Sequence, residues 1–160
     1  MIKKNDFKDA LKRSYLEFGY LNKQTEDKYP SVIAVREILQ LIRDLFFPGL
    51  YRALDQSISD DDFHHDIVDR LTLELEAVLK KNILYNDSAI SSSELNEKLD
   101  LILNLFFTEF IRIRQDLIAD ARAIYDGDPA AKTVEEVILS YVTFQAILVY
   151  RVAHFFYQHK

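Results

Sequence analysis

Apolar side chains recur every three or four residues along most of this chain. A first stripe runs over Phe7–Phe18, and a second runs over Val35–Phe46. This period predicts two amphipathic helices, each with one face directed toward a core. The pair Pro30–Ser31 suits the start of the second helix, and the pair Pro48–Gly49 suits its end. A short turn is expected to follow over residues 50–54.

Two further helices are expected between residues 60 and 106. The acidic triplet Asp60–Asp62 suits a helix start, and apolar residues at helical spacing follow it over 63–78. Ser91 and Glu94 have the spacing of a capping box, in which the serine and the glutamate each satisfy a backbone N–H of the other. The box precedes apolar residues aligned over 95–106, so it predicts the start of the next helix.

Thr108 interrupts that apolar run. We expect it to cap a fifth, separate helix over 110–124, which the turn Tyr125–Pro129 would end. Within this helix Arg112 and Asp116 are four residues apart, which is the spacing of an exposed ion pair.

The last segment is apolar on all sides. After a second capping-box spacing over Thr133–Glu136, Val137–Tyr157 is nearly continuous in apolar and aromatic residues. This length could cross a bilayer, but Gln145, Arg151 and His154 interrupt it, and a central arginine is costly in lipid. We therefore expect no membrane partner. A long apolar final helix instead predicts packing between chains or against a further domain.

Composition favours an all-α multi-helix bundle. The chain has 160 residues, 49% of them hydrophobic, which suits one domain over residues 1–160. Three glycines and three prolines are too few for a strand-rich fold with frequent turns. The glycines are also scattered, which excludes a glycine-rich phosphate loop. With no cysteine, thiolate chemistry and disulfides are excluded.

Charge limits the choice of partners. The formal net charge is -6, and no basic stripe is present to neutralise phosphates, so nucleic acid is not an expected partner. The first residues, Met1–Asp6, become charged at once and lack the apolar core of a secretory signal. A cytoplasmic location is therefore expected.

Two polar clusters carry ligand or acid–base residue types. The segment Asp60–Asp66 contains acids and the adjacent His64 and His65, but neighbouring helical residues point to different sides. We therefore favour a solvated helix start over a metal site, and expect no metal. Asp116 and Asp120 share a helix face as a carboxylate pair, but with arginine nearby we favour ion pairing over acid–base catalysis.

His154 is the remaining candidate for a general base. Tyr150 lies one turn before it and Arg151 is near it in the sequence. No nucleophile lies at a fixed spacing from this histidine. We therefore favour a hydrogen-bonded core histidine.

The end of the chain carries a specific combination of short motifs. They are Asp128-Pro129-Ala130-Ala131, Glu135–Tyr141, Phe144-Gln145-Ala146 and Tyr150-Arg151-Val152-Ala153-His154. This combination, over residues 125–157, resembles the end of the amino-terminal helical domain of serine O-acetyltransferases. One departure is Thr143, where the family often has glycine, and it puts in doubt the local bend between the last two helices.

The resemblance implies a role in acetyl transfer from acetyl-CoA to the serine hydroxyl, for cysteine synthesis. In that family the catalytic histidine and the acetyl-CoA site lie on a left-handed β-helix that follows the helical domain. We therefore expect no catalytic and no cofactor-binding residue in this chain, and a final helix that leads into the missing β-helix. Acetyl-CoA would be a co-substrate of the complete enzyme only.

The resemblance assigns one site residue, Asp128, to the amino-acid substrate through its ammonium group. The feedback inhibitor cysteine would use the same pocket. A structural role is compatible with this, because an aspartate before proline ends a helix by bonding its own backbone.

The resemblance also implies self-association, as a dimer of helical domains within a hexamer of the full enzyme. O-acetylserine sulfhydrylase is a partner that would bind through a carboxy-terminal tail missing here. A stand-alone helical interaction module without catalysis is the alternative.

Overall fold

The computed structural model describes residues 4–18, 30–52 and 60–159, without the side chains of Phe18 and residues 60–63. Within these ranges the chain forms six helices and no strand, which confirms the all-α prediction. They are α1 (Lys4–Phe18), α2 (Val32–Phe46), α3 (Asp60–Asn86), α4 (Ser92–Gly127), α5 (Val134–Ser140) and α6 (Val142–Gln158). The expected turn over residues 50–54 lies partly outside the described residues.

Local sequence fixes several helix ends as expected. The Ser31 hydroxyl accepts a hydrogen bond from the Ala34 N–H at 3.0 Å and begins α2. Ser91 and Glu94 form the predicted capping box at the start of α4. After α2, Gly49 has a φ of 82°, a left-handed conformation that glycine adopts without a steric penalty.

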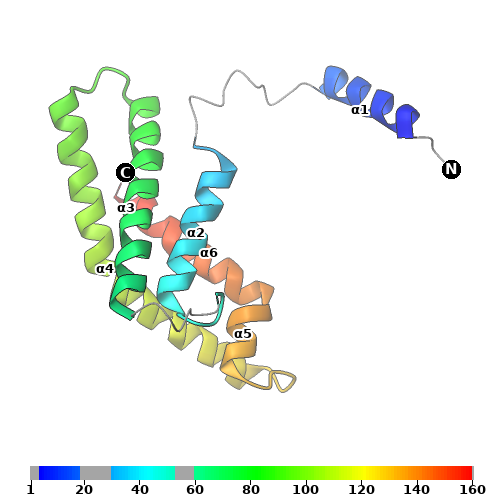
Figure 1. Ribbon diagram of the computed structural model, residues 1–160. Helices are drawn as coiled ribbons and strands as arrows, with labels where there is room; N and C mark the ends of the chain where they lie inside the picture. The colour runs from blue at the N-terminus through cyan, green and yellow to red at the C-terminus, as the bar shows by residue number, and fades with distance from the viewer. Residues whose placement is uncertain (1–3, 19–29, 53–59, 160) are drawn as a thin grey trace.

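α4 is one helix of 36 residues, so the prediction of a separate helix beginning at Thr108 is wrong. The Thr108 hydroxyl donates to the Asn104 carbonyl at 2.7 Å, four residues back. A threonine with its hydroxyl satisfied in this way is tolerated inside a helix and does not cap a new one. The helix is about 54 Å long at 1.5 Å per residue, and it reaches from α3 to α5 and α6 (Figure 1).

The apolar final segment is two helices, not one. α5 and α6 are bent by 73° at Tyr141, whose φ of −82° and ψ of 116° are extended. Thr143 lies beyond this point, inside α6. The bend therefore forms with threonine at the position where the family often has glycine. At the start of α5 the predicted capping box is only partly correct, because Glu136 accepts from the Lys132 N–H and not from that of Thr133.

The core forms where α2, α4 and α6 meet. The ring of Phe46 lies 4.3 Å from that of Phe110, and the ring of Phe106 lies 4.9 Å from that of Phe156, between centroids. Phe144 of α6 is fully buried in the same cluster. α3 packs against α2 and α4, whereas α1 lies apart from the other five helices (Figure 1).

Polar contacts tie down the end of α2. Asp44 is 1% exposed, and among the residues described it is the one buried charged side chain. Gln40 donates to its Oδ1 at 2.9 Å, and the guanidinium of Arg52 lies 3.2 Å from its Oδ2. The Arg114 side chain of α4 donates to the Phe46 carbonyl at 2.7 Å, which satisfies a carbonyl that the helix end leaves unpaired.

Candidate functional site

Asp128 lies where α4 ends and the chain turns toward α5. Its backbone N–H donates to the Ile124 carbonyl at 3.1 Å and caps the helix. Its Oδ1 accepts from the Ala130 N–H at 2.9 Å, and the Ala131 N–H donates back to the Asp128 carbonyl at 3.0 Å. A side chain that bonds the backbone two residues on forms an Asx turn. The structural role expected for this aspartate is therefore confirmed.

The second carboxylate oxygen of Asp128 is held by Tyr141. The Tyr141 hydroxyl donates to Oδ2 at 2.9 Å across 13 residues of sequence. The Ala130 N–H, and after it the Tyr141 hydroxyl, lower the pKa of the Asp128 carboxyl from its ordinary value of 3.8. The same hydrogen bond raises the pKa of Tyr141 above 10.0. Near neutral pH this turn therefore carries a fixed, partly exposed negative charge beside a neutral phenol.

Tyr141 is the residue at the break between α5 and α6. The break leaves the Ile138 carbonyl, in the last turn of α5, to accept from the Tyr51 hydroxyl at 2.7 Å and from the Gln145 amide at 2.6 Å. Gln145 also donates to the Tyr51 hydroxyl at 2.8 Å. Burial is the main cause that raises the pKa of Tyr51, so it stays a neutral donor. These contacts hold the bend, and the bend places the Tyr141 hydroxyl on Asp128.

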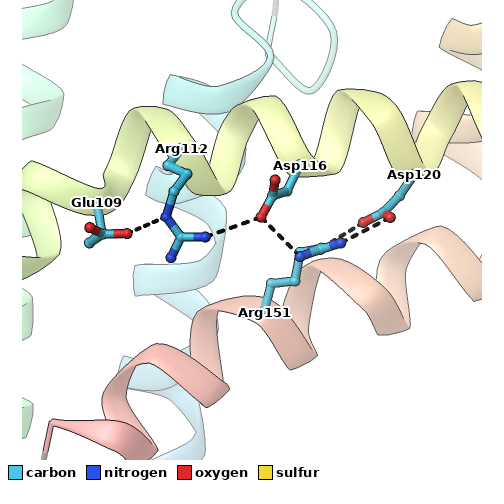
Figure 2. A network of polar contacts seen from close by, with 5 residues as sticks. All are labelled: Glu109, Arg112, Asp116, Asp120 and Arg151. Atoms are coloured by element: carbon cyan, nitrogen blue, oxygen red, sulfur yellow. Dashed lines mark hydrogen bonds and ion pairs between the residues drawn. The ribbon is translucent and has the colours of Figure 1, made fainter.

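An ion-pair network joins the outer faces of α4 and α6 (Figure 2). Arg151 of α6 donates to both oxygens of Asp120, at 2.6 and 3.0 Å, and to Asp116 at 3.1 Å. Asp116 also lies 3.5 Å from Arg112, which in turn contacts Glu109. The predicted pair of Arg112 and Asp116 is confirmed, as is the assignment of both aspartates to ion pairing.

The main partner of the two aspartates is Arg151, and the sequence did not indicate it. The Arg151 guanidinium forms a bidentate contact with Asp120, the geometry in which arginine binds a carboxylate most strongly. The hydrogen bond that Arg151 donates to Asp120 is the largest cause that raises the pKa of Arg151. The guanidinium therefore serves as a permanent clamp between the two helices.

His154 is exposed, so its prediction as a core histidine is wrong. Its ring stacks on Tyr150, with centroids 5.4 Å apart and planes 16° apart. Both rings line a cavity of about 320 Å³ between α4 and α6, beside Arg112 and Arg151. Within the described part of the chain, no serine, threonine or lysine lines this cavity. The arrangement places an imidazole beside a phenol and two guanidinium groups, without a serine, threonine or lysine among the described residues that it could activate.

The acidic start of α3 is only partly described. α3 begins at Asp60, as the sequence predicted, but the side chains of Asp60–Asp62 lie outside the described residues. His64, His65 and Asp66 are exposed. Nowhere in the described residues do three histidine, aspartate or glutamate side chains gather in a group able to hold a metal ion.

The apolar surface of α6 is split between the core and the outside. Phe144, Leu148, Val152 and Phe155 are buried. Val142 and Tyr157 stay 82% and 66% exposed. Among the described helices none alone has the length and hydropathy to cross a membrane, although α5 and α6 together pass that test as a bent pair.

These observations define an all-α domain with an anionic turn ahead of its last two helices. Over 44 residues the chain is 50% identical to a curated serine acetyltransferase of Synechococcus elongatus. The matched stretch is 28% of this chain and 18% of that relative, far below two thirds of either. No protein-family model matches the chain. The match supports a relationship to the serine acetyltransferases.

The sequence indicated Asp128 but missed Tyr141 as its partner. Tyr141 lay inside an apolar run and was counted as part of one helix. Its hydroxyl was the available signal, because a tyrosine in a mostly apolar segment places its polar tip on a partner or in water.

Proposed function

We propose that this chain is the amino-terminal helical domain of a cytoplasmic serine acetyltransferase. In that role it holds copies of the enzyme together and supplies Asp128 to the serine pocket. The observation that carries the proposal is the 50% identity over 44 residues to a serine acetyltransferase. The all-α architecture, with the Asp128-Pro129-Ala130 turn ahead of two final helices, is consistent with it.

The chemistry of Asp128 supports contact with the ammonium of serine. The carboxylate accepts one hydrogen bond at each oxygen, from Ala130 and Tyr141, which fixes its position. Each carboxylate oxygen has two lone pairs, so capacity for a further donor remains on both. A lowered pKa keeps the group ionised at neutral pH, as pairing with an ammonium requires. Cysteine carries the same ammonium group and would compete for this position.

The exposed apolar residues support self-association. Val142 and Tyr157 on α6, and Val32 and Ile33 on α2, are each at least 66% exposed. Exposed apolar side chains of this kind are typical of contacts between chains. We propose a dimer of helical domains within a hexamer of the complete enzyme. Acetyl-CoA would bind the β-helix of that enzyme, and the sulfhydrylase would bind its carboxy-terminal tail.

The test is to read the gene beyond the codon for Lys160. Hexapeptide repeats with an apolar residue at every sixth position would supply the acetyl-CoA site and support the proposal. A stop codon there would favour the stand-alone interaction module. Sedimentation of the 160-residue chain tests the association separately. A dimer supports that part of the proposal, and a monomer at every concentration contradicts it.

A further inference from the structure

α1 presents an apolar face to solvent. Phe7 and Leu11 are 55% and 37% exposed, and every side chain over residues 4–17 is exposed. The helix stands away from the other five (Figure 1). A helix of 15 residues is marginally stable alone in water, and most of its stability in a protein comes from packing its apolar face. α1 is therefore stabilised when its apolar face packs against another apolar surface.

The other five helices leave such an apolar surface uncovered. A groove of about 590 Å³ runs between α2, α3 and α6. Its walls are mainly apolar, with Val35 and Leu39 from α2, Leu75 and Leu79 from α3, and Val149 and Phe156 from α6. Val35 and Val149 are 40% and 37% exposed, so side chains of the groove face solvent.

The apolar stripe of α1 matches this groove in length and polarity. The stripe from Phe7 to Tyr15 spans eight residues, or about 12 Å of helix. The α3 wall from Leu75 to Asn86 spans eleven residues, or about 16 Å. The groove is lined by one residue of each charge, Asp87 and Lys98.

α1 carries charges on both flanks of its stripe. At 100° per residue, Lys8 and Lys12 fall on one flank, and Asp6, Arg13 and Glu17 fall on the other. An α1 helix lying along the groove can set the flank of Lys8 and Lys12 toward the carboxylate of Asp87.

We propose that this groove binds α1 of a second copy of the chain. The inference rests on the self-association proposed above and names the surface that forms it. In the structure α1 lies apart from α2, α3 and α6 (Figure 1), and no described residue of α1 lines the groove. The thirteen residues 19–31 between α1 and α2 allow a reach of up to roughly 43–47 Å when extended. Reciprocal exchange of one helix closes a two-fold pair and covers both stripes and both grooves at once.

Single cysteines test the contact directly, because the chain contains none of its own. One variant carries Leu11→Cys on the stripe, and a second carries Val149→Cys in the groove. Mixed in equal amounts and oxidised, they are expected to form a covalent dimer with one copy of each, identified by mass. Leu16→Cys is the matched control, since Leu16 is 80% exposed and lies well away from the stripe. Equal cross-linking by Leu16→Cys would overturn the proposal.

The chain carrying both Leu11→Cys and Val149→Cys separates exchange from docking within one copy. A disulfide-linked dimer is expected, and a disulfide closed within a monomer at high dilution would overturn the exchange. In sedimentation, Leu11→Asp should weaken dimerisation about a hundredfold, because it places a charge in an apolar contact twice per dimer. Leu16→Asp should leave the dimer constant within about twofold.

The outcomes distinguish binding of α1 in the groove from self-association in general. A wild-type dimer that Leu11→Asp leaves unchanged overturns the role of α1 and leaves self-association standing. A wild-type chain that stays monomeric at all concentrations overturns both.

Discussion

The hydroxyl of Tyr141 donates to Oδ2 of Asp128 at 2.9 Å, and this contact joins the turn after α4 to the break between α5 and α6. The turn at Asp128 and the helix break at Tyr141, which look independent in the sequence, are therefore structurally coupled. The break sets the direction of Tyr141, Tyr141 fixes the carboxylate, and the carboxylate also holds the turn through Ala130. A change at either residue is expected to affect the other.

Asp128→Asn, placed in the complete serine acetyltransferase that we propose, tests the proposed contact with serine. The amide keeps the shape of the side chain and removes its charge, so serine binding should weaken by about ten- to hundredfold. The acetyl-CoA constant should stay unchanged, and inhibition by cysteine should weaken together with serine binding. Steady-state kinetics measures all three. If the variant only melts at a lower temperature while its serine constant is unaltered, Asp128 has the turn role alone.

Asp126→Asn is the matched control for that variant. Asp126 is an exposed carboxylate two residues earlier, in the last turn of α4. Its removal changes the net charge by the same amount without touching the turn. We expect its serine constant to match that of the wild type.

Tyr141→Phe tests the coupling without changing any charge. Loss of the hydroxyl should raise the pKa of Asp128 toward 3.8, which a carboxyl NMR titration measures. The pKa of Asp128 should stay partly lowered, because the Ala130 N–H is the larger cause of its shift. Tyr150→Phe on the outside of α6 is the control and should leave that pKa in place. An unaltered pKa in Tyr141→Phe would mean that the hydrogen bond is absent in solution.

The pKa shifts of Asp128 and Tyr141 also determine how the stability of the protein changes at low and at high pH. The folded pKa of Asp128 is lowered, so its contribution is full above pH 3.8 and is lost as the pH falls through the folded value. The folded pKa of Tyr141 is raised, so its contribution is full below pH 10.0 and is lost as the pH rises through the folded value. Urea denaturation should show the difference between wild type and Tyr141→Phe as constant from about pH 5 to 9 and smaller beyond both limits.

Arg151→Ala should lower the free energy of unfolding by about 1–2 kcal/mol, because it removes a bidentate pair between two helices and leaves the Asp120 carboxylate without that guanidinium. Arg112→Ala is the control within the same network. Its side chain is 64% exposed, so its loss should cost less than about 0.5 kcal/mol. Urea denaturation at low salt measures both. Equal effects of the two substitutions would show that Arg151 does not clamp α6 to α4.

The 160 residues alone should show no acetyl transfer. That reaction needs a base for the serine hydroxyl and a site that holds the thioester beside it. In the described part of the chain, no serine, threonine or lysine lines the α4–α6 cavity beside the exposed His154. A thiol assay for released CoA, with serine present and absent, checks this. Serine-dependent release of CoA would contradict the assignment as a helical domain without a catalytic centre.

The helix ends that were predicted correctly depend on neighbours in sequence. Ser31 and Ser91 begin helices because a hydroxyl three residues before an N–H can accept from it in any tertiary context. Thr108 also carries a hydroxyl but has the opposite outcome, since its hydroxyl donates to a carbonyl four residues back. A threonine can cap a new helix or bond a carbonyl within a continuous one. The outcome depends on whether the residues on both sides pack on one continuous core, as those of α4 do.

The sequence by itself determined the all-α class, most helix ends, and the turn at Asp128. These follow from apolar period, caps and turn residues, which act over four or five positions. Only the tertiary structure decided the break at Tyr141, the burial of Asp44, the exposure of His154 and the clamp of Arg151. Each of these joins residues that lie far apart in the sequence or depends on what a second helix covers. A local pattern carries no information about which distant surface a side chain will meet, so packing alone settles it.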